Sequence, residues 1–94
     1  MAMLLELEEV KNYLRVDSDE EDDLVSGLSQ SAETLCMDVA RIADAEEFAA
    51  LGDTAKTAVL YATAYLYEHR EEADHHALTL TLRSLLFGVR KEGF

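Results

Sequence analysis

The chain has 94 residues, of which 49% are hydrophobic and 30% charged, and its formal net charge is -12. This length is that of a single domain, residues 1–94, and the composition is that of a globular chain and not of a disordered one. The negative charge argues against binding to nucleic-acid phosphates or anionic membrane surfaces, because both attract clusters of Lys and Arg. We therefore expect protein partners.

Residues that form turns are scarce, since the chain has no proline and four glycines. Sheet proteins need many such turns, whereas the abundant Ala, Leu and Glu favour helices. The composition predicts an all-α fold, a small bundle of about four helices. No apolar run is long enough to span a membrane, and the acidic N-terminus lacks the positive region of a secretory signal. We expect synthesis inside the cell and no membrane contact.

An acidic run, residues 17–23, separates the first two predicted helices. The first helix, residues 4–14, has Leu and Val at helical spacing. Within the run, Ser18 followed by Glu21 fits a capping box, in which each side chain satisfies a free backbone N–H. The other carboxylates would meet the positive end of the helix dipole; they are Asp19, Glu20, Asp22 and Asp23. The run predicts the start of a helix.

The second helix is predicted over residues 19–42. Its large apolar side chains keep a helical period; they are Leu24, Leu28, Leu35, Val39 and Ile42. Small residues in its middle would allow another helix to approach closely. At 1.5 Å per residue this helix would be roughly 35 Å long. That is long for so small a domain, so part of the helix could reach a neighbouring subunit.

A connector, residues 44–52, leads to a third helix predicted over residues 54–72. The connector residues expected to pin it to the core are Phe48 and Leu51, the expected turn is at Gly52, and the expected helix cap is Asp53 or Thr54. The third helix has almost no polar face between residues 58 and 67. Because a helix that is apolar all round must be covered on every side, it is either central in the bundle or covered by subunit association.

The last predicted element begins near Leu78. Alternation of Leu and Thr over residues 78–82 is typical of a strand, although the leucines of this region also fit a helix. We favour the helix, because a lone strand would have no partner. Gly88 is expected to end it, and residues 88–94 are expected to form a mobile tail that carries Arg90 and Lys91.

The acidic run begins like a calcium loop, with carboxylates at Asp17, Asp19 and Glu21. The match fails where the loop needs Gly and a bidentate Glu, because those positions hold Asp22 and Leu28. Helix capping explains the same carboxylates, so we expect no calcium site.

Three further groups of residues are candidates for a functional site. His69, Glu72 and His76 could share one helical face, but they match no zinc motif. A stacking platform for bases at Tyr61, Tyr65 and Tyr67 would lack a basic groove, so packing explains these tyrosines better. Cys36 falls in an apolar pattern that predicts a buried thiol. No nucleophile elbow or phosphate loop is present, so the sequence predicts no catalytic residue, cofactor or metal.

Three stretches carry a family pattern in order. The first is LEEVKNYLRVDSDEEDDLVSGLSQSAET, residues 7–34, a short helix and turn before an acidic helix start. The second is AVLYATAYLYEHRE, residues 58–71, and the third is LRSLLFGVR, residues 82–90. Together they resemble the opening, third helix and closing segment of the head–tail connector proteins, also called DNA-packaging adaptor proteins, of tailed bacteriophages and prophages.

The resemblance implies a small helical subunit that forms a ring with other copies of itself. The ring is expected under the portal protein at the capsid vertex, where it would extend the DNA channel and meet a tail-side head-closure protein. DNA would pass through without specific binding, and no chemistry is implied. The protein would be a virion component at the head–tail junction, made in the host cytoplasm.

Three sets of residues are candidates for these contacts. The core or oligomer-interface candidates are Leu24, Leu28, Tyr65 and Leu66. The candidates for carboxylates that face the channel, where they would repel DNA and let it slide, are Asp19, Glu20, Asp22 and Asp23. The candidates for docking the tail onto an acidic portal surface are Arg90 and Lys91.

The alternative function is that of an acidic helical regulator that binds a host or phage protein, for example by imitating DNA. DNA mimics spread carboxylates over one extended surface, whereas here they concentrate at helix starts and ends. A third hypothesis, a small metalloenzyme, would depend on the histidine set alone. Rings seen by electron microscopy would favour the connector over the regulator.

Overall fold

The computed structural model describes residues 5–69, 72 and 74–87. It contains five helices: α1 (Leu7–Leu14), α2 (Asp22–Ala40), α3 (Ala45–Ala49), α4 (Asp53–Glu68) and α5 (His75–Leu85). The described residues include no strand, so the all-α prediction and the helix favoured for the last element are both confirmed. The helix that exceeds the predicted four is the short α3, which lies inside the predicted connector.

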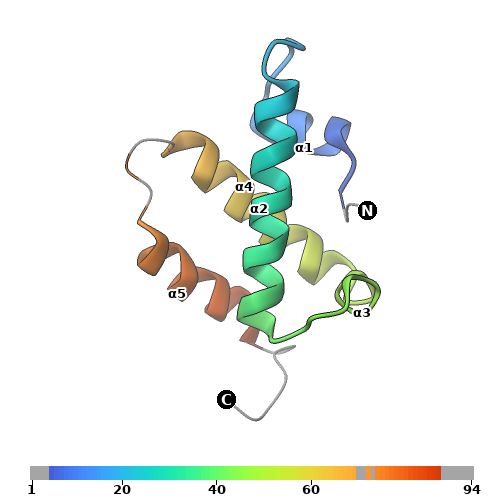
Figure 1. The fold of residues 1–94 in the computed structure, drawn as a ribbon, viewed down its shortest axis with the longest axis vertical. Coiled ribbons are helices and arrows are strands. Elements are labelled where there is room, and N and C mark those ends of the chain that lie inside the picture. Colours follow the sequence, from blue (N-terminus) through green and yellow to red (C-terminus); the bar gives the residue numbers. More distant parts are fainter. Residues whose placement is uncertain (1–4, 70–71, 73, 88–94) are drawn as a thin grey trace.

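The two longest helices, α2 and α4, cross and pack against each other over the largest contact in the fold (Figure 1). The other helices pack around this pair, with α1 and α5 each in contact with both α2 and α4. In Figure 1, α1 and α5 lie on opposite sides of α4. The crossing of α2 and α4 therefore forms the centre of the bundle, and it leaves two separate flanks.

The core lies between these helices and consists of small and medium-sized side chains. On α4 the buried residues recur on one face; they are Ala55, Ala58, Val59, Ala62, Thr63 and Leu66. From α2 the core takes Val25, Ala32, Cys36 and Val39, and Phe48 of α3 is fully buried beside them. The prediction that Phe48 pins the connector is confirmed. The many alanines let the helices approach closely, which explains how so short a chain forms a packed core.

The start of α2 differs from the prediction. The helix begins at Asp22 and not at Asp19, and its N-cap, Glu21, makes no capping hydrogen bond through its side chain. Ser18 Oγ accepts a hydrogen bond from the backbone N–H of Glu20 at 3.0 Å, so the predicted capping box at Ser18 is wrong. The reason is an intervening turn, in which the N–H of Asp22 donates to the carbonyl of Asp19.

One other predicted cap also differs, and one cap was not predicted. A capping box does occur, but in α1, where Glu6 and Glu9 satisfy each other's backbone N–H groups. At the start of α4 the N-cap is Gly52 and not Asp53 or Thr54, so no side chain caps this helix. Gly52 has φ 67°, which glycine adopts without steric cost, so the predicted turn there is confirmed. The backbone shape of this turn places Asp53 one position too late to cap.

Helices α1 and α2 end in the same way, at Arg15 and Arg41. Both arginines are left-handed, with φ 61° and 60°. After each arginine, an apolar residue donates its N–H five positions back: Val16 to the carbonyl of Lys11 at 2.9 Å, and Ile42 to that of Met37 at 3.0 Å. This is the Schellman arrangement, which satisfies the free carbonyls of a helix end. It ends α2 at Ala40, two residues before the predicted end.

The end of α4 at Glu68 is also earlier than the predicted residue 72. The Tyr65 hydroxyl accepts a hydrogen bond from the backbone N–H of Asp74 at 3.0 Å, which draws the chain back after the helix. The Asp74 carboxylate in turn accepts from the N–H of Ala77 at 3.0 Å and so caps α5. One tyrosine on α4 thereby sets where α5 begins.

Candidate functional site

A buried lysine joins the acidic run to α1. Lys11 has a side chain only 6% exposed, and its Nζ lies 2.9 Å from Asp19 Oδ1 and 2.8 Å from Asp22 Oδ1. These two hydrogen-bonded carboxylates hold the pKa of the Lys11 ammonium above its usual range. Lys11 correspondingly lowers the pKa of Asp19, chiefly through their hydrogen bond. The loop of the acidic run is therefore folded back onto α1 by charge.

Of the four carboxylates proposed to face the channel, two pair with Lys11 and two do not. Asp19 and Asp22 both pair with Lys11, although the Asp19 side chain remains 90% exposed. Glu20 and Asp23 are exposed, and among the described residues neither forms an ion pair. The structure therefore brings all four to one end of α2, where one cation offsets part of their charge.

A groove lies between the end of α1 and one side of α4. It has a volume of about 600 Å³ and is lined by Tyr13, Leu14, Arg15, Tyr61, Ala64, Tyr65, Glu68 and His69. Tyr13 and Tyr61 are 50% and 37% exposed. The Tyr65 ring stacks on His69 with 4.2 Å between ring centroids. We call this the α1–α4 groove; its lining is rich in aromatic side chains and includes a carboxylate and a guanidinium.

A second apolar surface lies on the outer side of α5. Leu78, Leu82 and Leu86 are fully buried and define the inner side of this helix. Leu80 lies on the opposite side of α5 and is 49% exposed, and Phe87, two residues beyond the end of the helix at Leu85, is 79% exposed. The exposed Arg83 lies between them along the chain. We call Leu80, Arg83 and Phe87 the α5 outer face.

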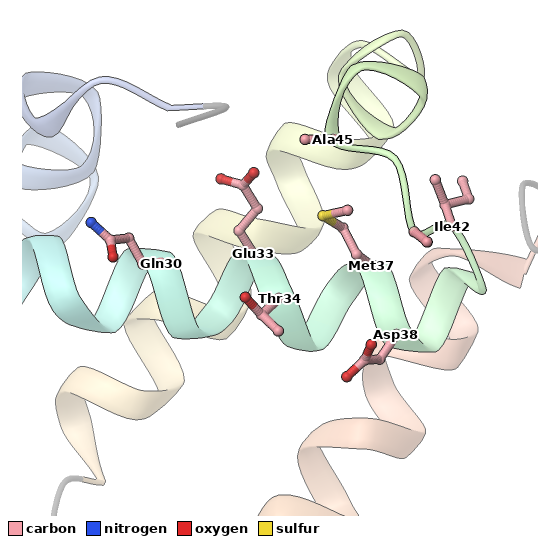
Figure 2. A pocket seen from close by; sticks show the side chains of 8 residues that line it. Gln30, Glu33, Thr34, Met37, Asp38, Ile42 and Ala45 are labelled. Atoms are coloured by element: carbon pink, nitrogen blue, oxygen red, sulfur yellow. The ribbon is translucent and has the colours of Figure 1, made fainter. Parts of the chain in front are cut away.

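A smaller pocket of about 330 Å³ lies beside α2 where the chain turns toward α3 (Figure 2). Its lining includes Glu33, Met37, Asp38 and Ile42. In Figure 2, Glu33 and Met37 point toward the segment that leads to α3, while Asp38 points away from it. Converging polar groups are therefore few, and the pocket offers no arrangement suited to catalysis.

The candidate interface residues from the sequence fall into different environments. Leu66 is 9% exposed and belongs to the core, whereas Leu24 is 38% exposed. Leu28 and Tyr65 are partly buried against the core. The interface role of these four residues remains a prediction. Arg90 and Lys91 lie outside the described residues.

Sequence reasoning missed Tyr13, Leu80 and Phe87 as surface candidates. Tyr13 and Leu80 each lie on the polar side of an amphipathic helix, and that position is the signal that would have identified them, whereas Phe87 follows the end of α5 and has no such signal. In the single chain all three side chains are exposed.

The described residues hold no group of three or more His, Cys, Asp or Glu side chains that could bind a metal ion. Cys36 is fully buried, as predicted, and burial, with a smaller effect from Glu33, raises the pKa of its thiol to about 12. Such a thiol is protonated near neutral pH and therefore unreactive. Within the described residues, no helix is both long and apolar enough to cross a membrane.

Comparison with known proteins gives one family. Searches of curated proteins and of solved structures found no match. A family model described as phage gp6-like head-tail connector protein matches residues 5–92, which is nearly the whole chain. The match includes all five helices. It also agrees with the resemblance seen in the sequence, and the chain therefore belongs to the phage gp6-like head–tail connector protein family.

Proposed function

We propose that copies of this chain form a ring beneath the portal at the capsid vertex, where the ring extends the DNA channel and receives a tail-side head-closure protein. The observation that carries the proposal is the family match over residues 5–92. Membership itself makes the chain a structural phage protein, a component of the virion that contacts other head and tail proteins. The ring, the portal contact and the channel are the finer parts of the proposal.

Exposed apolar side chains support self-association. Phe87 is 79% exposed and Tyr13 is 50% exposed in the single chain. Large apolar residues on a charged surface are typical of protein interfaces, in which aromatic residues are enriched. Tyr13 lies on α1 and Phe87 just beyond the end of α5, so the surface available for contact is not confined to one patch.

The acidic end of α2 supports a lining role in the channel. Asp19, Glu20, Asp22 and Asp23 lie together there, and Lys11 holds two of them in place. In a ring, each copy would repeat this cluster around the axis, and the resulting negative field would keep the DNA backbone from adhering. We include these four carboxylates as channel-facing residues, and Arg90 and Lys91 as residues that dock onto the portal.

The arrangement of carboxylates counts against the alternative function as a DNA mimic. A mimic needs free negative charge spaced along an extended surface. Here Asp19 and Asp22 pair with Lys11, and Glu21 accepts a hydrogen bond from Tyr67. The acidic run therefore has a structural role within the subunit, which favours the connector.

The test uses capsids of the phage that encodes the chain. Portal-bearing capsids without the protein are mixed with the purified full chain, sedimented and imaged by negative-stain electron microscopy. We expect co-sedimentation and ring-shaped density at one vertex, and no co-sedimentation with capsids that lack the portal. Absence of binding to portal-bearing capsids, with phage assembly unchanged when the gene is deleted, would refute the connector function.

A further inference from the structure

We propose that the α5 outer face of one subunit docks into the α1–α4 groove of the next copy of this chain. The contact would pair Phe87 and Leu80 with the aromatic side chains that line the groove, and Arg83 with Glu68. The inference deepens the proposed function and rests on it, since it names the two surfaces through which copies would join in a ring.

The first support is where apolar surface remains uncovered. The described residues include six large hydrophobic side chains that are exposed: Tyr13, Leu24, Tyr61, Leu80, Leu85 and Phe87. Four of these belong to the two surfaces, namely Tyr13 and Tyr61 in the groove and Leu80 and Phe87 on α5. One surface is concave and the other is a row of side chains projecting from a helix. Their shapes therefore suit each other more than either suits a copy of itself.

The second support is the position of the two surfaces in the fold. The groove is formed by α1 and α4, and α5 lies on the other side of α4 from α1 (Figure 1). The α5 outer face therefore cannot reach the groove of its own chain without rearrangement. A contact between two different surfaces on opposite flanks is head-to-tail, and such contacts close into rings or extend into filaments.

The third support is charge. The chain carries a net charge of -12, so copies repel each other unless a local contact opposes this. Arg83 is exposed and Glu68 is exposed, and neither forms an ion pair with a described residue. Arg83 lies in the last turn of α5 and Phe87 follows two residues after its end, while Tyr65 and Glu68 are one helical turn apart on α4, so a pairing of Arg83 with Glu68 would bring Phe87 beside the groove. Arg15 at the α1 end of the groove would then lie near the Phe87 ring, an arrangement that favours a cation–π contact.

The first experiment is a charge exchange measured by sedimentation velocity over a range of concentrations. We expect Arg83→Glu and Glu68→Lys each to lower the association constant at least about tenfold, because each places like charges together. The double variant R83E/E68K restores the pairing between copies and the net charge of the chain, so association should return toward that of the unmodified protein. Glu8→Lys changes an exposed carboxylate on α1 and serves as the matched control.

The second experiment uses two variants that each lose one surface. Phe87→Ser removes the projecting ring, and Tyr61→Arg fills the groove and repels Arg83. Each variant alone should be monomeric, with an unchanged circular dichroism spectrum. Mixed, they should form a one-to-one pair and nothing larger, because only one intact groove and one intact α5 outer face remain.

The outcomes separate this inference from the proposed function. Three outcomes would each overturn the docking mode. The single charge exchanges could leave the association constant unchanged, the double exchange could fail to restore it, or the two surface variants could fail to pair when mixed. Unmodified protein that stays monomeric at high concentration would overturn it too. The connector function is judged independently by binding to portal-bearing capsids, so it can stand when the docking mode fails.

Discussion

Tyr67 donates a hydrogen bond from its hydroxyl to Glu21 Oε1, across 46 positions of the chain. Tyr67 lies in the last turn of α4 and Glu21 is the N-cap of α2, so the bond joins the end of one long helix to the start of the other. This contact complements the apolar packing between α2 and α4. It also gives the acidic run a second link, in addition to the ion pairs of Asp19 and Asp22 with Lys11.

Replacing Tyr67 by Phe should remove this bond and lower the free energy of unfolding by about 1–2 kcal/mol, because a partly buried acceptor loses its donor. Tyr13→Phe is the matched control, since the Tyr13 hydroxyl makes no hydrogen bond to a described residue and should change stability little. Urea unfolding followed by circular dichroism measures both. Equal effects of the two substitutions would contradict a structural role for the bond.

Lys11→Met should destabilise the subunit, because Asp19 and Asp22 would lose the cation that both contact while the apolar part of the side chain is retained. The control is Lys56→Met: Lys56 is 43% exposed and lies 3.6 Å from Glu9, a pair of the kind that contributes little. We expect a clearly lower thermal midpoint for Lys11→Met alone. Similar midpoints for the two variants would show that the buried ammonium is not needed.

Acidification should weaken the link between α1 and the acidic run. The pKa of Asp19 is lowered in the folded chain, so its stabilising effect is complete above the ordinary carboxyl value near 3.9 and is lost as pH falls through the lower folded value. Asp19→Asn should therefore reduce the loss of stability on acidification. Asp17→Asn, in the same loop, should leave the acid side of the pH profile as it is. Thermal midpoints measured in steps from pH 7 downward provide the comparison.

The effect of Lys11 lies at the other end of the pH scale. Its pKa is raised, so its contribution is complete below the ordinary lysine value near 10.4 and fades only as pH rises through the higher folded value. Around neutral pH the ammonium is fully charged, and the pH dependence expected there from this cluster is small.

Ser29→Ala should stabilise the subunit by about 0.5–1.5 kcal/mol. Ser29 is 1% exposed in the middle of α2, and its Oγ has no hydrogen-bond partner among the described residues. Alanine removes the buried hydroxyl and is a better helix former. Ser31→Ala, on the exposed side of the same helix, reports the propensity effect alone. Destabilisation by Ser29→Ala would indicate that the hydroxyl does have a partner.

Deleting residues 88–94 should abolish binding to the portal and leave the fold intact. The segment carries Arg90 and Lys91, the cations proposed to meet an acidic portal surface. Binding to portal-bearing capsids and the thermal midpoint are measured on the same preparations. The double variant R90Q/K91Q separates charge from length, and full binding by the shortened chain would exclude the segment from the contact.

The helices could be predicted from the sequence because their apolar periods are regular, as in α2 and α4. The helix ends were harder to predict, since they depend on particular backbone shapes. Ser18 followed by Glu21 has the spacing of a capping box, yet a turn through Asp19 moves the helix start past it. The end of α4 depends on Tyr65 binding the backbone of Asp74, a contact that no local pattern indicates.

The candidate surfaces were less predictable than the fold. Lys11 stands among glutamates in α1, where the pattern indicates an exposed charge, and only the return of the acidic run buries it. In a strand, Leu80 would share one side with Leu78 and Leu82, because these leucines alternate with Thr79 and Thr81. In a helix the same spacing places it on the outer side. Whether such a side chain is buried or exposed depends on how the helices pack against one another.

The left-handed arginines that end α1 and α2 also determine the dimensions of the subunit. At its C-terminal end each helix is stopped by hydrogen bonds among its own last residues and the two that follow. The C-terminal end of α2, the longest helix, is therefore fixed within the single chain. A partner that binds at the C-terminal end of α2 cannot lengthen the helix by a further turn as it stands. The hydrogen bonds at Arg41 and Ile42 would have to break first.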